Sequence, residues 1–232
     1  MLKVPLSALT PKVWTPMRSY DPDAGNLWLA RILWDSGAIQ FGEFNIGTTM
    51  RSPVYINVRL MISNPRALRH VGDLIAEETR TLAGMLRPTI APFELVAGVP
   101  MGGLHIATAF SLVADVPMIY PHPRHHEHDL YPEIEGSYYP GQRVLLVDDL
   151  ITGGTSIVET AETLRRAGLS VQNAVVLLDR QAGAATRLRA EGIHLHPLLK
   201  LETLVNYLVS REVITQAQYA QCLTYIESSG GA

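Results

Sequence analysis

Short apolar runs alternate with stretches of helical periodicity through the second half of the chain. Such βαβ alternation predicts an α/β fold, with a mainly parallel sheet flanked by helices in a Rossmann-like topology. In sheets of this kind, ligands bind beyond the carboxyl ends of the strands. The predicted strands are residues 95–99, 116–120, 143–147 and 171–178, and the predicted helices between them are 103–114 and a segment from about 155 to Gly168.

The two ends of the chain show other patterns. Residues 1–23 contain four prolines and little periodicity, which indicates an irregular arm. We expect a helix at 24–36, and paired short strands within 41–60 with turns around Gly47 and Pro53. Asn64 and Pro65 then form an N-cap and first-turn proline for a long amphipathic helix. Two further helices are expected at the C-terminal end, at 201–211 and 216–227.

Composition favours a globular enzyme. A chain of 232 residues with 47% hydrophobic content buries roughly 70% of its unfolded surface, so one domain over 24–232 is expected. The net charge of −3 and the lack of a basic cluster argue against nucleic acid as a partner. No apolar run is long enough to span a membrane. Cys222 is the single cysteine, which favours a reducing compartment, and we expect a cytoplasmic protein.

Residues 144–156 carry the most specific chemical signal. An apolar run ends at Asp148 and Asp149, and a turn of glycine and hydroxyl residues, 152–156, then opens a helix. Backbone N–H groups and the helix dipole at such a turn favour an anion. The carboxylates suit sugar hydroxyls or a metal ion beside that anion, so a phosphorylated sugar fits both halves. The alternative is an ordinary βα turn whose aspartates cap the helix.

This segment resembles the phosphoribosyl pyrophosphate (PRPP) signature of the type I phosphoribosyltransferases. In that signature, two hydrophobic and two acidic residues precede Thr-x-Gly-Thr. Other stretches are similar to orotate phosphoribosyltransferase, including the corresponding half of bifunctional UMP synthase. These stretches are residues 41–44, 51–57, 96–100, 134–136 and 175–181.

The resemblance implies a small N-terminal hood at about 24–62 and a mobile loop at 121–137. In the family, this loop closes over the active site of the neighbouring subunit of a homodimer. The implied reaction transfers the 5-phosphoribosyl group from PRPP to orotate, giving orotidine 5′-monophosphate and pyrophosphate. Magnesium is implied as well, bound mainly through PRPP.

Residue roles follow from the same resemblance. Asp148 and Asp149 are expected to hold the ribose hydroxyls. The 5′-phosphate is assigned to the turn, the pyrophosphate to cationic loop residues and the orotate to two further side chains. The turn residues are Thr152, Gly153, Gly154, Thr155 and Ser156. The cationic loop residues are Arg124, His125 and His128, and the side chains expected to bind orotate are Arg180 and Tyr55.

Several cationic positions of the family differ here. In the resembling family, a lysine is usual at the position of Gly47, and many bacterial members have another at the position of Gly102. His125 and His128 stand where the family loop typically has two lysines. Imidazole has an ordinary pKa near 6.5, so these replacements are not permanently charged. A metal site and an unspecialised solvated loop are alternatives for the loop histidines.

The substitutions leave two functional alternatives open. One is a catalytically weakened homologue that binds PRPP or a nucleotide in a regulatory role, and the other is transfer to another acceptor base. Arg180 discriminates between bases, because orotate carries a carboxylate and purines do not. The alternative for Arg180 is an exposed arginine at the end of a strand.

Overall fold

A six-stranded sheet forms the centre of the protein, in a computed structural model that describes residues 26–46, 49–123 and 132–230. Neighbouring strands are parallel except for the antiparallel pair β4–β5, so the predicted α/β class with a mainly parallel sheet is confirmed. In spatial order the strands are β5 (Ile134–Glu135), β4 (Met118–Pro121), β3 (Leu95–Gly98), β6 (Arg143–Ile151), β7 (Ser170–Asp179) and β8 (His194–Lys200).

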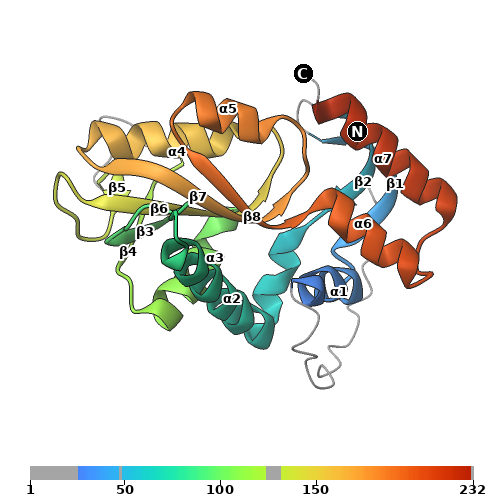
Figure 1. The fold of residues 1–232 in the computed structure, drawn as a ribbon, viewed down its shortest axis with the longest axis horizontal. Coiled ribbons are helices and arrows are strands. Elements are labelled where there is room, and N and C mark those ends of the chain that lie inside the picture. The colour runs from blue at the N-terminus through green and yellow to red at the C-terminus, as the bar shows by residue number, and fades with distance from the viewer. Residues whose placement is uncertain (1–25, 47–48, 124–131, 231–232) are drawn as a thin grey trace.

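Helices cover both faces of this sheet (Figure 1). Residues at odd and even positions of a strand point to opposite faces, so Leu145 and Leu146 of β6 belong to different apolar clusters. The first face packs against α2 (Pro65–Gly84) and α3 (Gly102–Ala114). The second face packs against α4 (Thr155–Arg166) and α5 (Ala184–Ala190). Burial on both faces explains why β6 and β7 read as continuous apolar runs.

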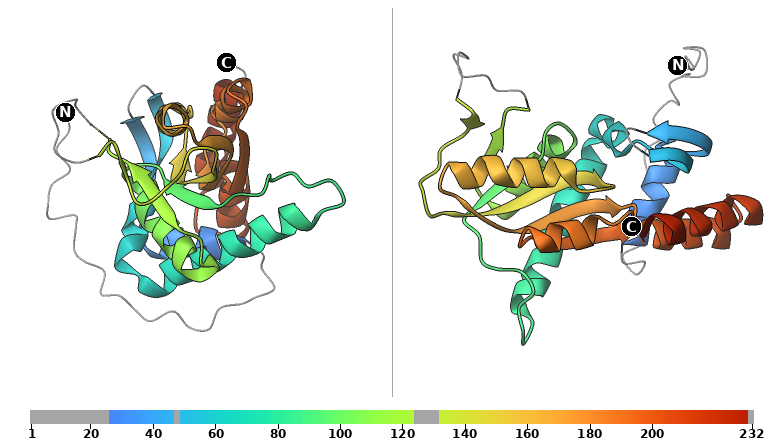
Figure 2. Two further views of the ribbon diagram at one scale, coloured as in Figure 1. Left: turned by 90° about the vertical axis from the view of Figure 1, so that its left-hand side faces the viewer. Right: turned by 90° about the horizontal axis from the view of Figure 1, so that it is seen from above.

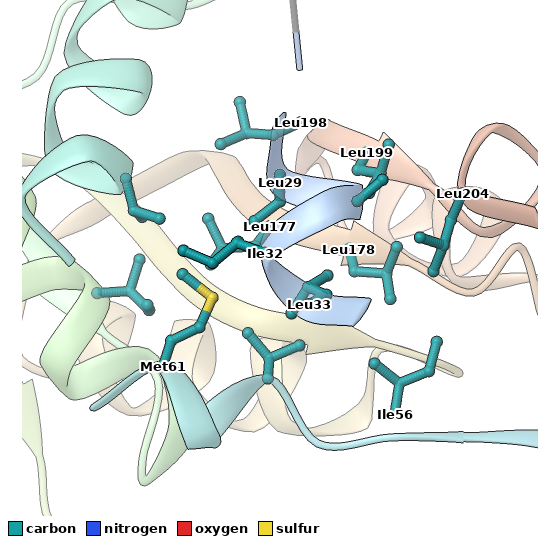
Figure 3. Packing of buried hydrophobic residues seen from close by; sticks show 14 of the residues in the cluster. Leu29, Ile32, Leu33, Ile56, Met61, Leu177, Leu178, Leu198, Leu199 and Leu204 are labelled. Carbon is teal, nitrogen blue, oxygen red and sulfur yellow. The ribbon is translucent and has the colours of Figure 1, made fainter. Parts of the chain in front are cut away.

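Elements from both ends of the chain lie together beside this sheet (Figure 2). They share the apolar cluster of the first sheet face, in which Leu29 and Leu33 pack with Leu177 of β7 and with Leu204 (Figure 3). The cluster therefore fixes these elements to the carboxyl end of the sheet. They are α1 (Leu27–Asp35), the antiparallel hairpin β1 (Ile39–Ile46) and β2 (Thr49–Ile56), the 3₁₀ helix η3 (Val58–Ser63), α6 (Leu201–Ser210) and α7 (Gln216–Gly230).

Local sequence signals located several element ends correctly. Asn64 caps α2, since its side-chain oxygen accepts a hydrogen bond from the Ala67 N–H at 3.1 Å. Gly168 follows the end of α4 with a φ of 83°, which is the left-handed conformation that glycine tolerates best. Among the described residues, no helix is both long and apolar enough to cross a membrane.

Two expectations about local structure were wrong. The strand predicted to end at Val147 continues to Ile151, because β7 pairs with it over that whole length. Pro53 lies inside β2 and does not form a turn. A proline is tolerated there because β2 pairs with a single strand, which leaves one edge without ladder bonds.

Close packing joins α3 to β6 at Gly103. Its N–H donates to the Val99 carbonyl at 2.8 Å, and a Cβ at this position would overlap the backbone carbonyl oxygen of Val147. Glycine is thus required for α3 to begin directly beside the two aspartates.

We expect Gly103→Ala to lower the free energy of unfolding by about 1–3 kcal/mol, because a backbone oxygen cannot move aside as a side chain can. Gly84→Ala is the control. A Cβ at Gly84 in α2 meets nothing within 4 Å, so this change should be neutral or slightly stabilising. Urea unfolding of both variants measures the difference, and equal midpoints would show that the contact at Gly103 is not tight.

Candidate active site

A cleft of about 270 Å³ lies at the carboxyl ends of β3 and β6, between the sheet and the β1–β2 hairpin. This is where an open α/β sheet is expected to bind ligands. A second cavity, lined by residues that include Phe93 and Asn173, holds about 10 Å³ and is too small for a substrate. The cleft is lined by Tyr55, Ile56, Asn57, Val58, Arg59, Pro100, Met101, Gly102, Asp148, Asp149, Leu150, Thr152, Ser156 and Arg180.

The turn from Thr152 to Ser156, here called the phosphate loop, connects β6 to α4. Gly154 occupies the N-cap position of α4 with a φ of 81°, and no side chain of the described residues caps this helix. The alternative in which the aspartates cap the helix is therefore wrong. The backbone N–H groups of the first turn and the positive end of the helix dipole are available to an anion.

The two aspartates lie at the inner end of the same cleft. Pairing between β3 and β6 ends at Gly98 and Val147, so both carboxylates project beyond this ladder. Asp148 is 6% exposed and accepts a hydrogen bond from the Asp149 N–H at 2.8 Å. Burial, together with the charge of Asp149, raises the pKa of Asp148 well above its ordinary range.

Asp149 also explains the glycine at position 102. A Cβ on Gly102 would overlap the carboxylate of Asp149, which packs against the N-terminus of α3. The space that a longer residue would occupy at position 102 is filled by this carboxylate.

Arg180 forms another wall of the cleft. Its side chain is 1% exposed, and its Nη2 donates to the hydroxyl of Ser52 and to the Val54 carbonyl, the latter at 3.1 Å. The guanidinium carbon lies 5.5 Å from the centre of the Tyr225 ring of α7, within the range of a cation–π contact. Burial lowers the pKa of Arg180. The interpretation of Arg180 as an exposed strand-end residue is wrong.

Most predicted site residues described by the structure line one cleft. Tyr55, Thr152 and Ser156 border it together with both aspartates and Arg180, and Gly153, Gly154 and Thr155 complete the phosphate loop. Arg124, His125 and His128 lie outside the described residues, so their roles stay predictions. The predicted loop 121–137 also contains His122 and Glu135, which the structure describes. His122 Nε2 lies 3.0 Å from Glu135 Oε1.

Three residues of the site region were not predicted. Asn57 and Arg59 line the cleft, and the Asn57 side-chain oxygen is buried without a hydrogen-bond partner among the described residues. His105 of α3 lies near Asp149 and Arg59; burial lowers its pKa, and the charge of Asp149 partly opposes this. Asn57 is the last residue of the motif at 51–57, and Arg59 lies two residues beyond it. This motif was the only sequence signal that pointed to either residue. No motif marked His105.

Comparison with known proteins agrees with this geometry. Residues 61–189 match the model of the phosphoribosyl transferase domain, and the chain belongs to that family. More particularly, its relatives include orotate phosphoribosyltransferases, as the motifs predicted. The enzyme of Pyrococcus abyssi is 36% identical over 176 residues, which cover 76% of this chain and 93% of that protein.

Solved structures give the same result. The orotate phosphoribosyltransferase of Aeropyrum pernix is 34% identical with a TM-score of 0.67, over 78% of this chain and 98% of that one. UMP synthase of Leishmania donovani is 33% identical with a TM-score of 0.76 over 88% of this chain. The chain spans 42% of the length of that synthase.

The raised pKa of Asp148 predicts a pH-dependent cost in stability. The unfolded chain releases this proton above about pH 3.9, whereas the folded protein retains it to higher pH. Stability is therefore lost as the pH rises through this window towards the folded-state pKa. Asp148→Asn should raise the melting temperature, by a margin that widens as the pH rises above about 4.

Calorimetry from pH 4 to 8 measures this margin. Asp115→Asn is the control, because Asp115 is an exposed carboxylate directly after α3, away from the cleft lining. A melting difference for Asp148→Asn that does not change with pH would contradict the assignment.

Proposed function

We propose that this protein transfers the 5-phosphoribosyl group of PRPP to orotate, giving orotidine 5′-monophosphate and pyrophosphate. The observation that carries the proposal is a buried guanidinium in the same cleft as an uncapped phosphate loop. An anion-binding turn serves the sugar phosphate, and Arg180 offers a cation to the carboxylate of the base. Relatives named orotate phosphoribosyltransferase support this choice of acceptor.

The residues divide the substrate between them. The phosphate loop binds the 5′-phosphate, and Asp148 and Asp149 accept hydrogen bonds from the ribose hydroxyls. Arg180 and Tyr55 orient orotate so that its N1 faces the anomeric carbon. N1 forms the new bond and releases its proton to solvent, while the bond to pyrophosphate breaks and its electron pair leaves with that group.

Charge develops on both sides of this bond. The sugar gains oxocarbenium character, as in glycosyl transfer generally, and negative charge builds on the departing pyrophosphate. The carboxylate of Asp149 is placed to oppose the positive charge. Arg59 lines the cleft and lies near His105 of α3, so we assign this cation to the pyrophosphate. Arg124, His125 and His128 are proposed to complete that side.

Magnesium fits the donors that the cleft provides. Among the described residues, no group of three or more histidine, cysteine or acidic side chains forms an all-protein metal site. Mg²⁺ commonly uses one or two carboxylates together with substrate phosphates, and Asp148 and Asp149 would be these carboxylates. When bound, the ion would neutralise part of the charge on the leaving pyrophosphate.

A weakened, PRPP-binding homologue is the second candidate. The observation that favours it is the glycine at position 102, which supplies no side chain at a position where the family resemblance implies a lysine in many bacterial members. Removal of one preorganised donor costs roughly 10²–10³ in rate, so fewer cations would mean slower turnover without loss of binding. Transfer to another acceptor base is the third possibility, and Arg180 argues against a purine.

Incubation with PRPP, magnesium and separate bases tests the acceptor. Orotate should release pyrophosphate, whereas uracil, which has the same ring without the carboxylate, should react much more slowly. Arg180→Gln should lower kcat/KM for orotate about 10- to 100-fold more than kcat/KM for uracil, because only orotate has a carboxylate that can bind the guanidinium.

Equal rates for orotate and uracil in the parent protein would contradict this acceptor assignment. Tight PRPP binding without pyrophosphate release from any base would instead favour the weakened homologue. Unchanged orotate kinetics in Arg180→Gln would remove Arg180 from the base site.

We further propose a homodimer with shared active sites in the cytoplasm, on the basis of the family loop and the single cysteine. In such a dimer, Arg124 of one chain acts at the site of the other. Separately inactive Arg124→Ala and Asp149→Asn chains should regain part of the parent activity when mixed, because some hybrid dimers contain one intact site. Light scattering checks the mass, and a monomer at micromolar concentration would end this proposal.

A further inference from the structure

We propose that Arg187 of α5 is a binding residue for the 5′-phosphate of PRPP. This inference rests on the proposed function, because it adds a cation to the same phosphate site. Arg187 lies 31 positions after Ser156 in the chain, beyond the motif that defines the phosphate loop.

A direct hydrogen bond links Arg187 to the phosphate loop. Its Nη1 donates to the hydroxyl of Thr155 at 2.8 Å, across 32 positions of sequence. Thr155 is the first residue of α4, so its hydroxyl stands beside the free N–H groups of that helix. A guanidinium that reaches Thr155 therefore also reaches the space in front of the helix N-terminus.

The packing of α5 fixes this arrangement. A Cβ built on Gly154 would lie 3.5 Å from Leu188 and 3.7 Å from the Ala184 side chain, so one side of α5 is in contact with the loop. Leu188 is fully buried and Ala184 nearly so. Arg187 precedes Leu188 directly, and its exposed side chain extends from an anchored helix over the loop.

The hydrogen-bond chemistry of Thr155 favours an anion as the third partner. A hydroxyl has one proton to donate and lone pairs to accept. Because the guanidinium donates to it, the threonine proton remains available and is directed elsewhere. Phosphate oxygens accept from both groups, and the remaining N–H groups of Arg187 match the bidentate geometry that arginine adopts with phosphate.

Charge balance also supports this placement. The phosphate loop and the carboxyl-terminal part of the strand before it, residues 147–156, contain two aspartates and no lysine or arginine. Among the described residues, Arg187 forms no ion pair, so no carboxylate of that part of the chain neutralises its charge. A dianionic phosphate between the loop and Arg187 would supply the missing counter-charge.

The expected kinetic effect is specific. The 5′-phosphate is remote from the anomeric carbon and keeps its charge throughout the reaction. Arg187 should therefore bind substrate and transition state about equally, which lowers KM without raising kcat. This separates Arg187 from cations that face the pyrophosphate.

Calorimetric titration of ribose 5-phosphate into Arg187→Gln tests the proposal without any chemical step. We expect the dissociation constant to rise about 10- to 100-fold, the usual effect of losing a hydrogen bond between charged groups. In the PRPP-dependent assay, KM for PRPP should rise by a similar factor with kcat within about twofold of the parent.

Arg189→Gln is the matched control, because it removes the same charge from another exposed position of the same short helix. Its affinity for ribose 5-phosphate should equal that of the parent. If Arg187→Gln binds ribose 5-phosphate as tightly as Arg189→Gln, Arg187 is not part of the phosphate site. Because this titration requires no base, it decides the role of Arg187 even if orotate proves not to be the acceptor.

Discussion

The arrangement of the cleft depends on one buried cation. Arg180 stands directly after β7, and its guanidinium binds the Ser52 hydroxyl and the Val54 carbonyl of β2, more than 120 residues earlier in the chain. A buried charge is costly unless it is hydrogen-bonded or paired, so these contacts and the Tyr225 ring must all remain in place. The hairpin is thereby held against the sheet end, and the cleft between them has a defined width.

The opposite wall of the cleft is acidic, which sets the electrostatic character of the site. Burial and the charge of Asp149 raise the pKa of Asp148, and the Asp149 carboxylate packs at the start of α3. Neutral and charged carboxyl groups can both accept hydrogen bonds from sugar hydroxyls. The absence of a side chain at Gly102 follows from the same packing, since the carboxylate fills the space beside it. The close packing of the Asp149 carboxylate against Gly102 thus leaves no room for a cationic side chain at position 102.

The sequence predicted the parts of the site that depend on local signals. The phosphate loop and aspartates were recognisable because a strand, a glycine turn and a helix follow one another within 25 residues. The burial of Arg180 was not predictable, since it depends on β2 and α7, which are distant in sequence. Arg59 and Arg187 were missed for the same reason. The elements β8 and α5 were not predicted, because their apolar residues do not recur at a clear strand or helix spacing. On α7, Cys222 and Tyr225 are buried, and Tyr219 and Ile226 pack partly buried against the same cluster.

The position of α7 has a consequence for the synthesis of this protein. The phosphate loop is complete once residue 166 has been made, but Arg180 needs the ring of Tyr225 in α7, which is synthesised only after β7, β8 and α6. A nascent chain can therefore form the phosphate loop while it is still being elongated. The surroundings of the Arg180 guanidinium have to wait until α7 has left the ribosome, and termination before α7 would leave this buried cation without the Tyr225 ring beside it.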